Sequence, residues 1–171
     1  MNCWCIMVKT GEEEKFKSQA EQKLLAENPS ERNRLYFFKK RMQSRRNQQF
    51  IETLFPGYVF LESEKLGRAK IELLKTVYGF YHFLLSNEKP QALSGYDLEY
   101  FSLFKKSGEV LGLSRVCFDA KQRIVIIDGP LKGLEGNVIR VNQRCKRVTI
   151  EVDMLGAPRK IDLSYTEVAS V

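Results

Sequence analysis

The sequence predicts an α+β protein in two parts, a mixed N-terminal part and an all-β C-terminal part. Up to about residue 107, short apolar runs typical of strands alternate with segments whose apolar residues recur every three or four positions, as in helices. Beyond residue 116 the apolar residues recur at every second position, the period of half-buried strands. Between the parts, the helical recurrence of apolar residues does not continue through Gly108 and Gly112. We therefore predict a linker over residues 108–116.

The first elements are predicted to be a strand and a helix. The apolar run Trp4–Val8 is typical of a buried strand. Thr10 and Glu13 have the spacing of a capping box, in which the two side chains bond backbone N–H groups at the start of a helix. The helix is predicted to end at Asn28-Pro29, and its apolar stripe consists of Phe16, Ala20 and Leu24.

The rest of the N-terminal part is predicted to complete a mainly antiparallel sheet with flanking helices. Residues 34–50 look extended and basic, and residues 54–61 form a strand that Pro56 and Gly57 introduce. Residues 62–77 return to a helical period, and residues 78–84 indicate another buried strand. Ser94 is placed to begin a last helix that continues through Phe104. The stripe of the middle helix consists of Leu66, Ala69, Leu73 and Val77.

The C-terminal part is predicted to be a small five-stranded barrel. Residues 124–127 form an apolar strand, and apolar residues alternate with polar ones over 148–154 and 160–164. Turns are expected at Asp128-Gly129-Pro130 and at Gly156-Ala157-Pro158. A small closed barrel accommodates such short strands economically.

Positive charge is concentrated rather than spread evenly. The net charge is +7, and seven cations with no acid between them lie between Glu31 and Glu52. Four of the eight residues from Arg140 to Arg147 are also basic, again without an acid. Clusters of this kind favour a polyanionic partner, although a solvated charged hairpin would look the same in sequence.

The sequence offers little for catalysis. His82 is the only histidine and lies in an apolar run, and no phosphate-binding loop, nucleophile elbow or metal-ligand spacing occurs. The four cysteines, at positions 3, 5, 117 and 145, are expected to be reduced thiols. We therefore predict no enzyme, no metal and no cofactor. Without a leader or a membrane-length apolar run, a cytoplasmic protein is expected.

Two blocks resemble the NusG family of transcription elongation factors. Residues 55–60, Phe-Pro-Gly-Tyr-Val-Phe, are similar to the hallmark of the family's N-terminal domain, and residues 128–138, Asp-Gly-Pro-Leu-Lys-Gly-Leu-Glu-Gly-Asn-Val, resemble its KOW motif. The blocks occur in the family's order and at its spacing. The resemblance implies a polymerase-binding domain over residues 1–107, a linker over 108–116 and a KOW barrel over 117–171.

The resemblance also implies partners and contact residues. An apolar depression on the N-terminal domain holds the clamp helices of the largest subunit of RNA polymerase, and the matching positions are Trp4, Phe55, Pro56, Tyr58 and Phe83. The family usually reads Trp-Tyr in its first strand, whereas this chain has Trp4-Cys5. The candidates for contact with upstream or nontemplate DNA are Lys39, Lys40, Arg41, Arg45 and Arg46, for which a solvated hairpin is an equal alternative.

The KOW part indicates a specialised branch of the family. Where the general factor has a Phe-Gly-Arg turn that contacts Rho and a ribosomal protein, this chain has Leu155-Gly156-Ala157. Its Gly108-Glu109-Val110 linker, the Gly-Pro-Leu-Lys-Gly form of the motif at residues 129–133 and the Lys146-Arg147 pair look more like the LoaP branch, whose members are processive antiterminators that recognise an RNA hairpin. The RNA-binding candidates, expected on one rim, are Lys132, Arg140, Arg144, Lys146 and Arg147. We expect a monomer that does not contact a membrane. The alternatives are a housekeeping NusG or a ribosome-associated KOW protein.

Overall fold

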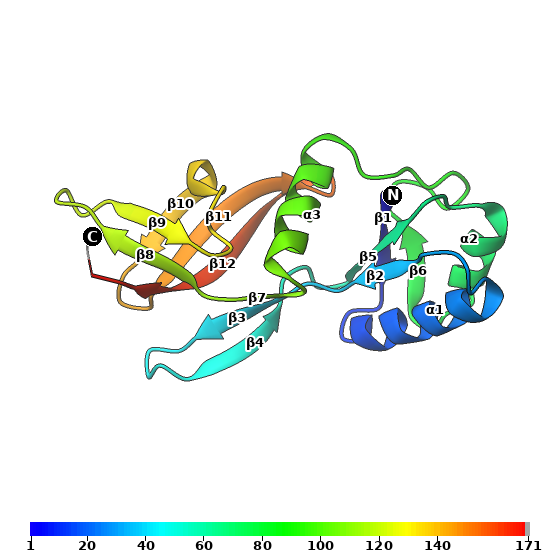
Figure 1. Ribbon diagram of the computed structural model, residues 1–171, viewed down its shortest axis with the longest axis horizontal. Coiled ribbons are helices and arrows are strands. Elements are labelled where there is room, and N and C mark those ends of the chain that lie inside the picture. The colour runs from blue at the N-terminus through cyan, green and yellow to red at the C-terminus, as the bar shows by residue number, and fades with distance from the viewer. Residues whose placement is uncertain (170–171) are drawn as a thin grey trace. The chain divides into compact units, whose positions relative to one another are not determined.

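The structure is a computed structural model that describes residues 1–169 and divides into two compact units (Figure 1). Unit 1 contains residues 1–37 and 55–98, and unit 2 contains residues 38–54 together with the chain from residue 99. The α+β class expected from the sequence is confirmed. The domain boundaries at residues 107 and 117 stay a prediction, and the basic hairpin of residues 38–54 groups with the C-terminal strands.

Unit 1 is built on a four-stranded sheet with the order β2-β5-β1-β6, in which all neighbouring strands pair antiparallel. Its strands are β1 (Asn2–Val8), β2 (Arg34–Tyr36), β5 (Tyr58–Ser63) and β6 (Phe80–Phe83). Two helices, α1 (Glu13–Glu27) and α2 (Arg68–Lys75), pack their apolar residues against one side of it. This core includes Ile6, Phe16, Ala20, Leu24, Val59, Leu61, Ile71 and Leu74.

Two of the predicted elements differ in the structure. The helix expected from residue 62 begins only at Arg68, after an extended Gly67, and it buries Ile71 and Leu74, whereas Ala69 of the predicted stripe is exposed. The strand expected to be buried is β6, whose Tyr81 is 58% exposed. β6 is one of the two edge strands of the sheet, so it has a neighbouring strand on one side only.

The predicted capping box is wrong in detail, because Glu13 joins α1 to the turn before β5. The α1 N-cap is Glu12, and it makes no side-chain capping bond. The buried Glu13 carboxylate instead accepts hydrogen bonds from the backbone N–H groups of Gly11 and Gly57, both at 2.8 Å. Gly57 has a φ of +81°, a conformation that favours glycine. The Glu13 carboxylate therefore helps to hold the turn that carries Phe55 and Pro56, together with the backbone bond from the N–H of Val8 to the carbonyl of Gly57 at 2.9 Å.

Replacing Glu13 with glutamine is expected to destabilise the protein by about 1–3 kcal/mol, since the amide end would leave one buried N–H without an acceptor. Chemical denaturation would measure the loss. Glu14→Gln is the matched control, because Glu14 is exposed in the same helical turn and its replacement should cost no more than about 0.5 kcal/mol. Equal effects from the two variants would contradict the role of Glu13.

Unit 2 combines a basic three-stranded sheet with a C-terminal five-stranded sheet. The first sheet has the order β4-β3-β7 and consists of β3 (Lys39–Gln43), β4 (Gln49–Thr53) and β7 (Val110–Leu111). Phe38, just before β3, packs its ring against Phe101 and Phe104 of α3 (Gly95–Ser107) at centroid distances of 5.8 and 6.2 Å. The segment predicted as a linker thus contains β7 and the start of β8.

The five-stranded sheet has the order β10-β11-β12-β8-β9. Its strands are β8 (Ser114–Phe118), β9 (Ile124–Asp128), β10 (Val138–Asn142), β11 (Arg147–Met154) and β12 (Ala157–Glu167). The predicted number of strands is confirmed, but the closed barrel is not, because within residues 1–169 β9 and β10 are the edges of an open sheet. The chain between them turns through η1 (Glu135–Asn137) and buries Leu131 and Leu134 instead of extending the pairing.

The second residue of the KOW-like block, Gly129, occupies a backbone position that requires glycine. Gly129 has a φ of +94°, and a Cβ there would lie 2.6 Å from the Cα of Ser114. The Ser114 hydroxyl accepts a hydrogen bond from the N–H of Leu131 at 3.0 Å, which holds the turn against β8. The structural role expected for this glycine is thus confirmed.

Candidate functional site

The side of the unit 1 sheet that faces away from α1 and α2 carries a cluster of large side chains. In the antiparallel register Phe60 lies opposite both Cys5 and Tyr36, and Tyr58 lies opposite Met7. Opposed residues share a side of the sheet, and their neighbours Val59 and Leu61 point into the core. The ring of Phe55 packs edge-on against Phe60 at 6.0 Å. We call Tyr36, Phe55, Tyr58 and Phe60, with Cys5 and Met7, the aromatic face.

The predicted polymerase-binding residues are divided between the two sides of this sheet. Phe55 and Tyr58 belong to the aromatic face, and Pro56 is exposed in the turn beside them. Trp4 lies opposite Leu61, and Phe83 lies opposite Ile6, so both share the side of core residues. They are only 6% and 1% exposed, and Phe55 on the other side is also buried, at 3%, so of the predicted set Pro56 and Tyr58 are the more accessible. The structure therefore brings together part of the predicted set.

The aromatic face includes residues that the predicted set lacks, namely Cys5, Met7, Tyr36 and Phe60. Alternation along each strand was the signal that would have found them, because Phe60 is two residues from Tyr58. At its edge the Tyr36 hydroxyl donates to Glu62 at 3.0 Å, and the guanidinium of Arg34 lies 4.9 Å from the Tyr36 ring centroid. Charged groups of both signs thus lie beside the aromatic rings.

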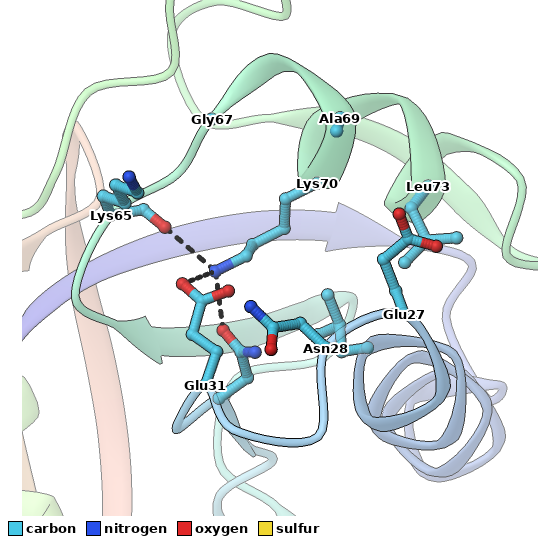
Figure 2. A pocket seen from close by; sticks show the side chains of 10 residues that line it. Glu27, Asn28, Glu31, Lys65, Gly67, Ala69, Lys70 and Leu73 are labelled. Atoms are coloured by element: carbon cyan, nitrogen blue, oxygen red, sulfur yellow. Dashed lines mark hydrogen bonds and ion pairs between the residues drawn. The ribbon is translucent and has the colours of Figure 1, made fainter.

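Unit 1 also contains a polar site, which is formed around Lys70 on α2 (Figure 2). Its buried ammonium group donates to Glu31 at 2.6 Å, to Asn33 and Ser63 at 2.7 Å each, and to the carbonyl of Lys65 at 3.0 Å. Lys70, Glu31, Asn33 and Lys65 line a cavity of about 290 Å³. The ammonium beside Glu31 lowers the pKa of that carboxyl below its ordinary value. Since Lys70 is satisfied on every side, its arrangement is that of a structural cation.

The basic residues of the β3–β4 hairpin lie in different environments. Lys40 is 8% exposed, donates to the carbonyl of Asp162 at 2.8 Å and pairs with Glu52 at 3.5 Å. Its charge is neutralised within unit 2, which does not favour the DNA contact proposed for it. Arg41, Arg45 and Arg46 are exposed, and Lys39 is partly exposed.

The predicted RNA-binding residues do not all share one rim. Arg144, Lys146 and Arg147 lie in or next to the turn after β10, whereas Lys132 precedes the other end of that strand. Lys132 also pairs with Glu135 at 3.6 Å and donates to the carbonyl of Ile126 at 3.2 Å. Arg140 is exposed within β10, opposite Thr149. The exposed charge is therefore concentrated at the β10–β11 turn.

No group of three or more residues suited to hold a metal ion occurs in the described part of the chain. Over the same residues, none of the helices is both long enough and apolar enough to cross a membrane.

The fold and these surfaces define an α+β protein with an aromatic sheet face in one unit and a group of exposed cations in the other. A family model described as "Transcription termination factor nusG" matches residues 2–102, which is more than half of the sequence. The chain therefore belongs to the NusG family.

The individual relatives are distant in sequence, and they carry the name of the same family. The chain is 26% identical over 117 residues to "Transcription termination/antitermination protein NusG" of Bacillus subtilis, and 24% identical over 123 residues to the protein of that name in Rickettsia bellii. These matches cover 67% and 72% of this chain, but only 65% and 63% of the relatives. A solved structure of Thermotoga maritima NusG aligns with a TM-score of 0.63 over 95% of this chain and 93% of that one. At 19% identity the likeness supports the fold alone.

Proposed function

We propose that this protein is a processive antiterminator of the LoaP type, which binds RNA polymerase through unit 1 and structured leader RNA through its C-terminal sheet. Recruited by the RNA, it would travel with the polymerase and hold the clamp closed, so that pausing and termination are disfavoured. Its mechanism is binding, with no reaction catalysed. Membership of the NusG family and the names of the curated relatives support the role in transcription.

The proposed polymerase contact is the accessible edge of the aromatic face at Pro56 and Tyr58, with the clamp helices of the largest subunit as its partner. The rings of Tyr36, Phe55 and Phe60 are each 3% exposed or less, so they support this edge from within the unit. Pro56 is exposed and Tyr58 partly exposed at the edge of this face, and rigid rings beside charged groups are suited to anchor an amphipathic helix. Trp4 and Phe83 contribute indirectly in this proposal, by supporting the sheet from its core side.

The observation that carries the specialised role is the basic β10–β11 turn. Arg144 is exposed, Lys146 and Arg147 are partly exposed, and no acid occurs from residue 136 to residue 150. Such a turn matches the phosphates of structured RNA, which proteins read largely through shape and backbone. The β11–β12 turn supports the same assignment. Where the general factor has Phe-Gly-Arg, this turn has a buried Leu155, which is 4% exposed, and no guanidinium.

The test is binding of the full chain to the hairpin of its own operon leader and to a scrambled hairpin, together with read-through of a terminator placed downstream. We expect selective binding that weakens as salt rises, and read-through only on templates that carry the hairpin. Pro56→Ala with Tyr58→Ala should abolish read-through while RNA binding persists. Equally weak binding to both hairpins would contradict the proposal.

A second candidate is a housekeeping elongation factor, which the names of the curated relatives favour. It would suppress pausing on any template, and the hairpin would have no effect. The same read-through assay therefore distinguishes the two functions. A ribosome-associated KOW protein would instead show no effect on transcription and would sediment with ribosomal subunits.

A further inference from the structure

Two basic turns that are a hundred residues apart in sequence meet in unit 2. One is the tip of the β3–β4 hairpin, residues 44–48, and the other is the β10–β11 turn, residues 143–146; both lie at the same end of the unit, at the lower left of Figure 1. The Nε of Arg45 donates to the Sγ of Cys145 at 3.4 Å. We call Arg45, Arg46, Arg144 and Lys146 the double-turn surface.

The double-turn surface concentrates positive charge around one thiol. Arg45 lowers the pKa of Cys145 through its hydrogen bond, and the nearby charges of Arg147 and Arg144 act in the same direction. Neither turn contains an acid, since the sequence has none from residue 32 to residue 51 or from 136 to 150. Like charges held this close repel one another, and a polyanion relieves that repulsion.

The hairpin is held against the C-terminal sheet by groups behind its tip. The N–H of Gln43 donates to the Ser164 hydroxyl at 3.1 Å, and that hydroxyl lies 3.8 Å from the sulfur of the buried Met42. Lys40 adds its bond to the carbonyl of Asp162. These anchors are on β12, so the two turns are positioned together before any ligand binds, which lowers the cost of ordering them on binding.

The cations remain available while the turns are joined. Only the Nε of Arg45 is used by Cys145, which leaves the two terminal nitrogens of its guanidinium for a bidentate contact with phosphate. Arg46 and Arg144 are exposed, and Lys146 is partly exposed with a φ of +50° in its turn. The Ser44 hydroxyl accepts from the N–H groups of Arg46 and Gln48, which fixes the hairpin tip.

We propose that the double-turn surface is a single phosphate-binding site, in which the β3–β4 hairpin and the β10–β11 turn grip the backbone of the same structured RNA. The hairpin cations thus belong to the RNA site instead of a separate DNA site. This inference rests on the proposed RNA-binding function and extends it to residues outside the KOW-like part of the sequence.

The test measures the affinity of the full chain for the leader hairpin as salt is varied, in two charge-removing variants. Each variant, Arg45→Gln with Arg46→Gln or Arg144→Gln with Lys146→Gln, removes two of the proposed phosphate contacts. We expect each variant to bind the RNA roughly tenfold more weakly near physiological salt. The negative slope of the logarithm of the association constant against the logarithm of the salt concentration should become shallower by roughly 1.5–2.

The matched control is Lys89→Gln with Lys121→Gln, which removes the same net charge from exposed positions outside the double-turn surface. It should change affinity by less than about twofold and leave the salt slope nearly unchanged. Thermal denaturation of each variant establishes that the hairpin substitutions leave the protein folded, as expected for exposed turn residues.

The outcomes separate this inference from the proposed function. Loss of RNA binding in the β10–β11 variant alone would overturn the composite site and leave the RNA-binding function standing. Loss of duplex or nontemplate DNA binding in the hairpin variant, with RNA affinity intact, would also overturn it and return the hairpin to a DNA contact. Absence of selective RNA binding by the unaltered protein would contradict the proposed function itself.

Cys145 provides a local readout that does not depend on substitution. Its thiol belongs to the β10–β11 turn and accepts the bond from Arg45 of the hairpin, so bound RNA should slow its alkylation by a small maleimide several-fold. Cys117, a partly exposed cysteine on β8, serves as the internal reference in the same mass spectrum. Equal alkylation rates of Cys145 with and without saturating RNA would contradict the proposed position of the RNA.

Discussion

Phe83→Ala is expected to destabilise the protein by about 3–5 kcal/mol, the range typical for removing a fully buried aromatic side chain. Phe83 is 1% exposed, lies opposite Ile6 in the sheet and packs its ring against Phe80 at 5.4 Å. Its replacement would leave a cavity between the sheet and the helices of unit 1. Chemical denaturation of the full chain would measure the change.

The control lies two residues earlier on the same strand. Tyr81 is 58% exposed, so Tyr81→Ala should cost less than about 1 kcal/mol. The comparison also decides how Phe83 contributes to polymerase binding. If Phe83→Ala left stability unchanged and yet abolished that binding, Phe83 would be a direct contact and its assignment to the core would be wrong. Tyr58→Ala should show the reverse pattern, with binding lost and stability nearly kept.

Lys70→Ala is expected to cost about 2–4 kcal/mol, somewhat less than the loss of one partner from a fully buried ion pair. The substitution removes three N–H donors that four acceptors share, and it leaves Glu31, Asn33 and Ser63 around an empty space. The expected loss of stability is below that of a fully buried pair because the side chain of Glu31 is 18% exposed, so its carboxylate can be partly hydrated once Lys70 is removed. Denaturation at neutral pH measures the effect.

Lys75→Ala is the matched control, because Lys75 lies on the same helix and forms an exposed pair with Glu72 at 2.9 Å. An exposed pair of this kind contributes less than about 1 kcal/mol. Equal losses from the two variants would show that Lys70 is not a buried structural cation.

The pH dependence of stability gives a second check on Lys70. Lys70 lowers the folded-state pKa of Glu31, so this pair contributes fully above the ordinary glutamate pKa, and its contribution disappears as pH falls through the lowered value. Lys70→Ala should therefore lose stability less steeply in acid than the unaltered protein. If the variant and the unaltered protein lost stability equally steeply as pH falls, this linkage would be contradicted.

Much of the fold could be predicted from the sequence because local patterns specify it. The stripe of Phe16, Ala20 and Leu24 is the buried side of α1, and the alternation over 148–154 is the inward and outward pattern of β11. The predictions for residues 62–77 were wrong because contacts with the rest of unit 1, and not the local pattern, decide where the helix begins and which side chains are buried. The periodicity of residues 62–77 does not reveal that Gly67 delays α2, or that the lysine at position 70 is buried.

The candidate site could be predicted only in part. The block at residues 55–60 lies in the turn before β5 and in β5 itself, but the division of its predicted partners between the two sides of the sheet follows from the pairing of β1 with β5 and β6. A linear sequence does not state which residue of one strand opposes which residue of another. Trp4 and Phe83 are therefore typical of a binding surface in sequence and are core-side residues in the structure.

By itself the sequence determined the α+β class, the family blocks and the presence of two acid-free basic segments, because composition and short-range periodicity are local properties. Only the tertiary structure decided that Lys40 is neutralised inside unit 2, that the C-terminal sheet stays open, and that Arg45 meets Cys145. The contact of Arg45 with Cys145 joins residues 100 positions apart, and the bond from Lys40 to the carbonyl of Asp162 joins residues 122 positions apart. Such contacts arise from the packing of whole strands, which no local pattern encodes.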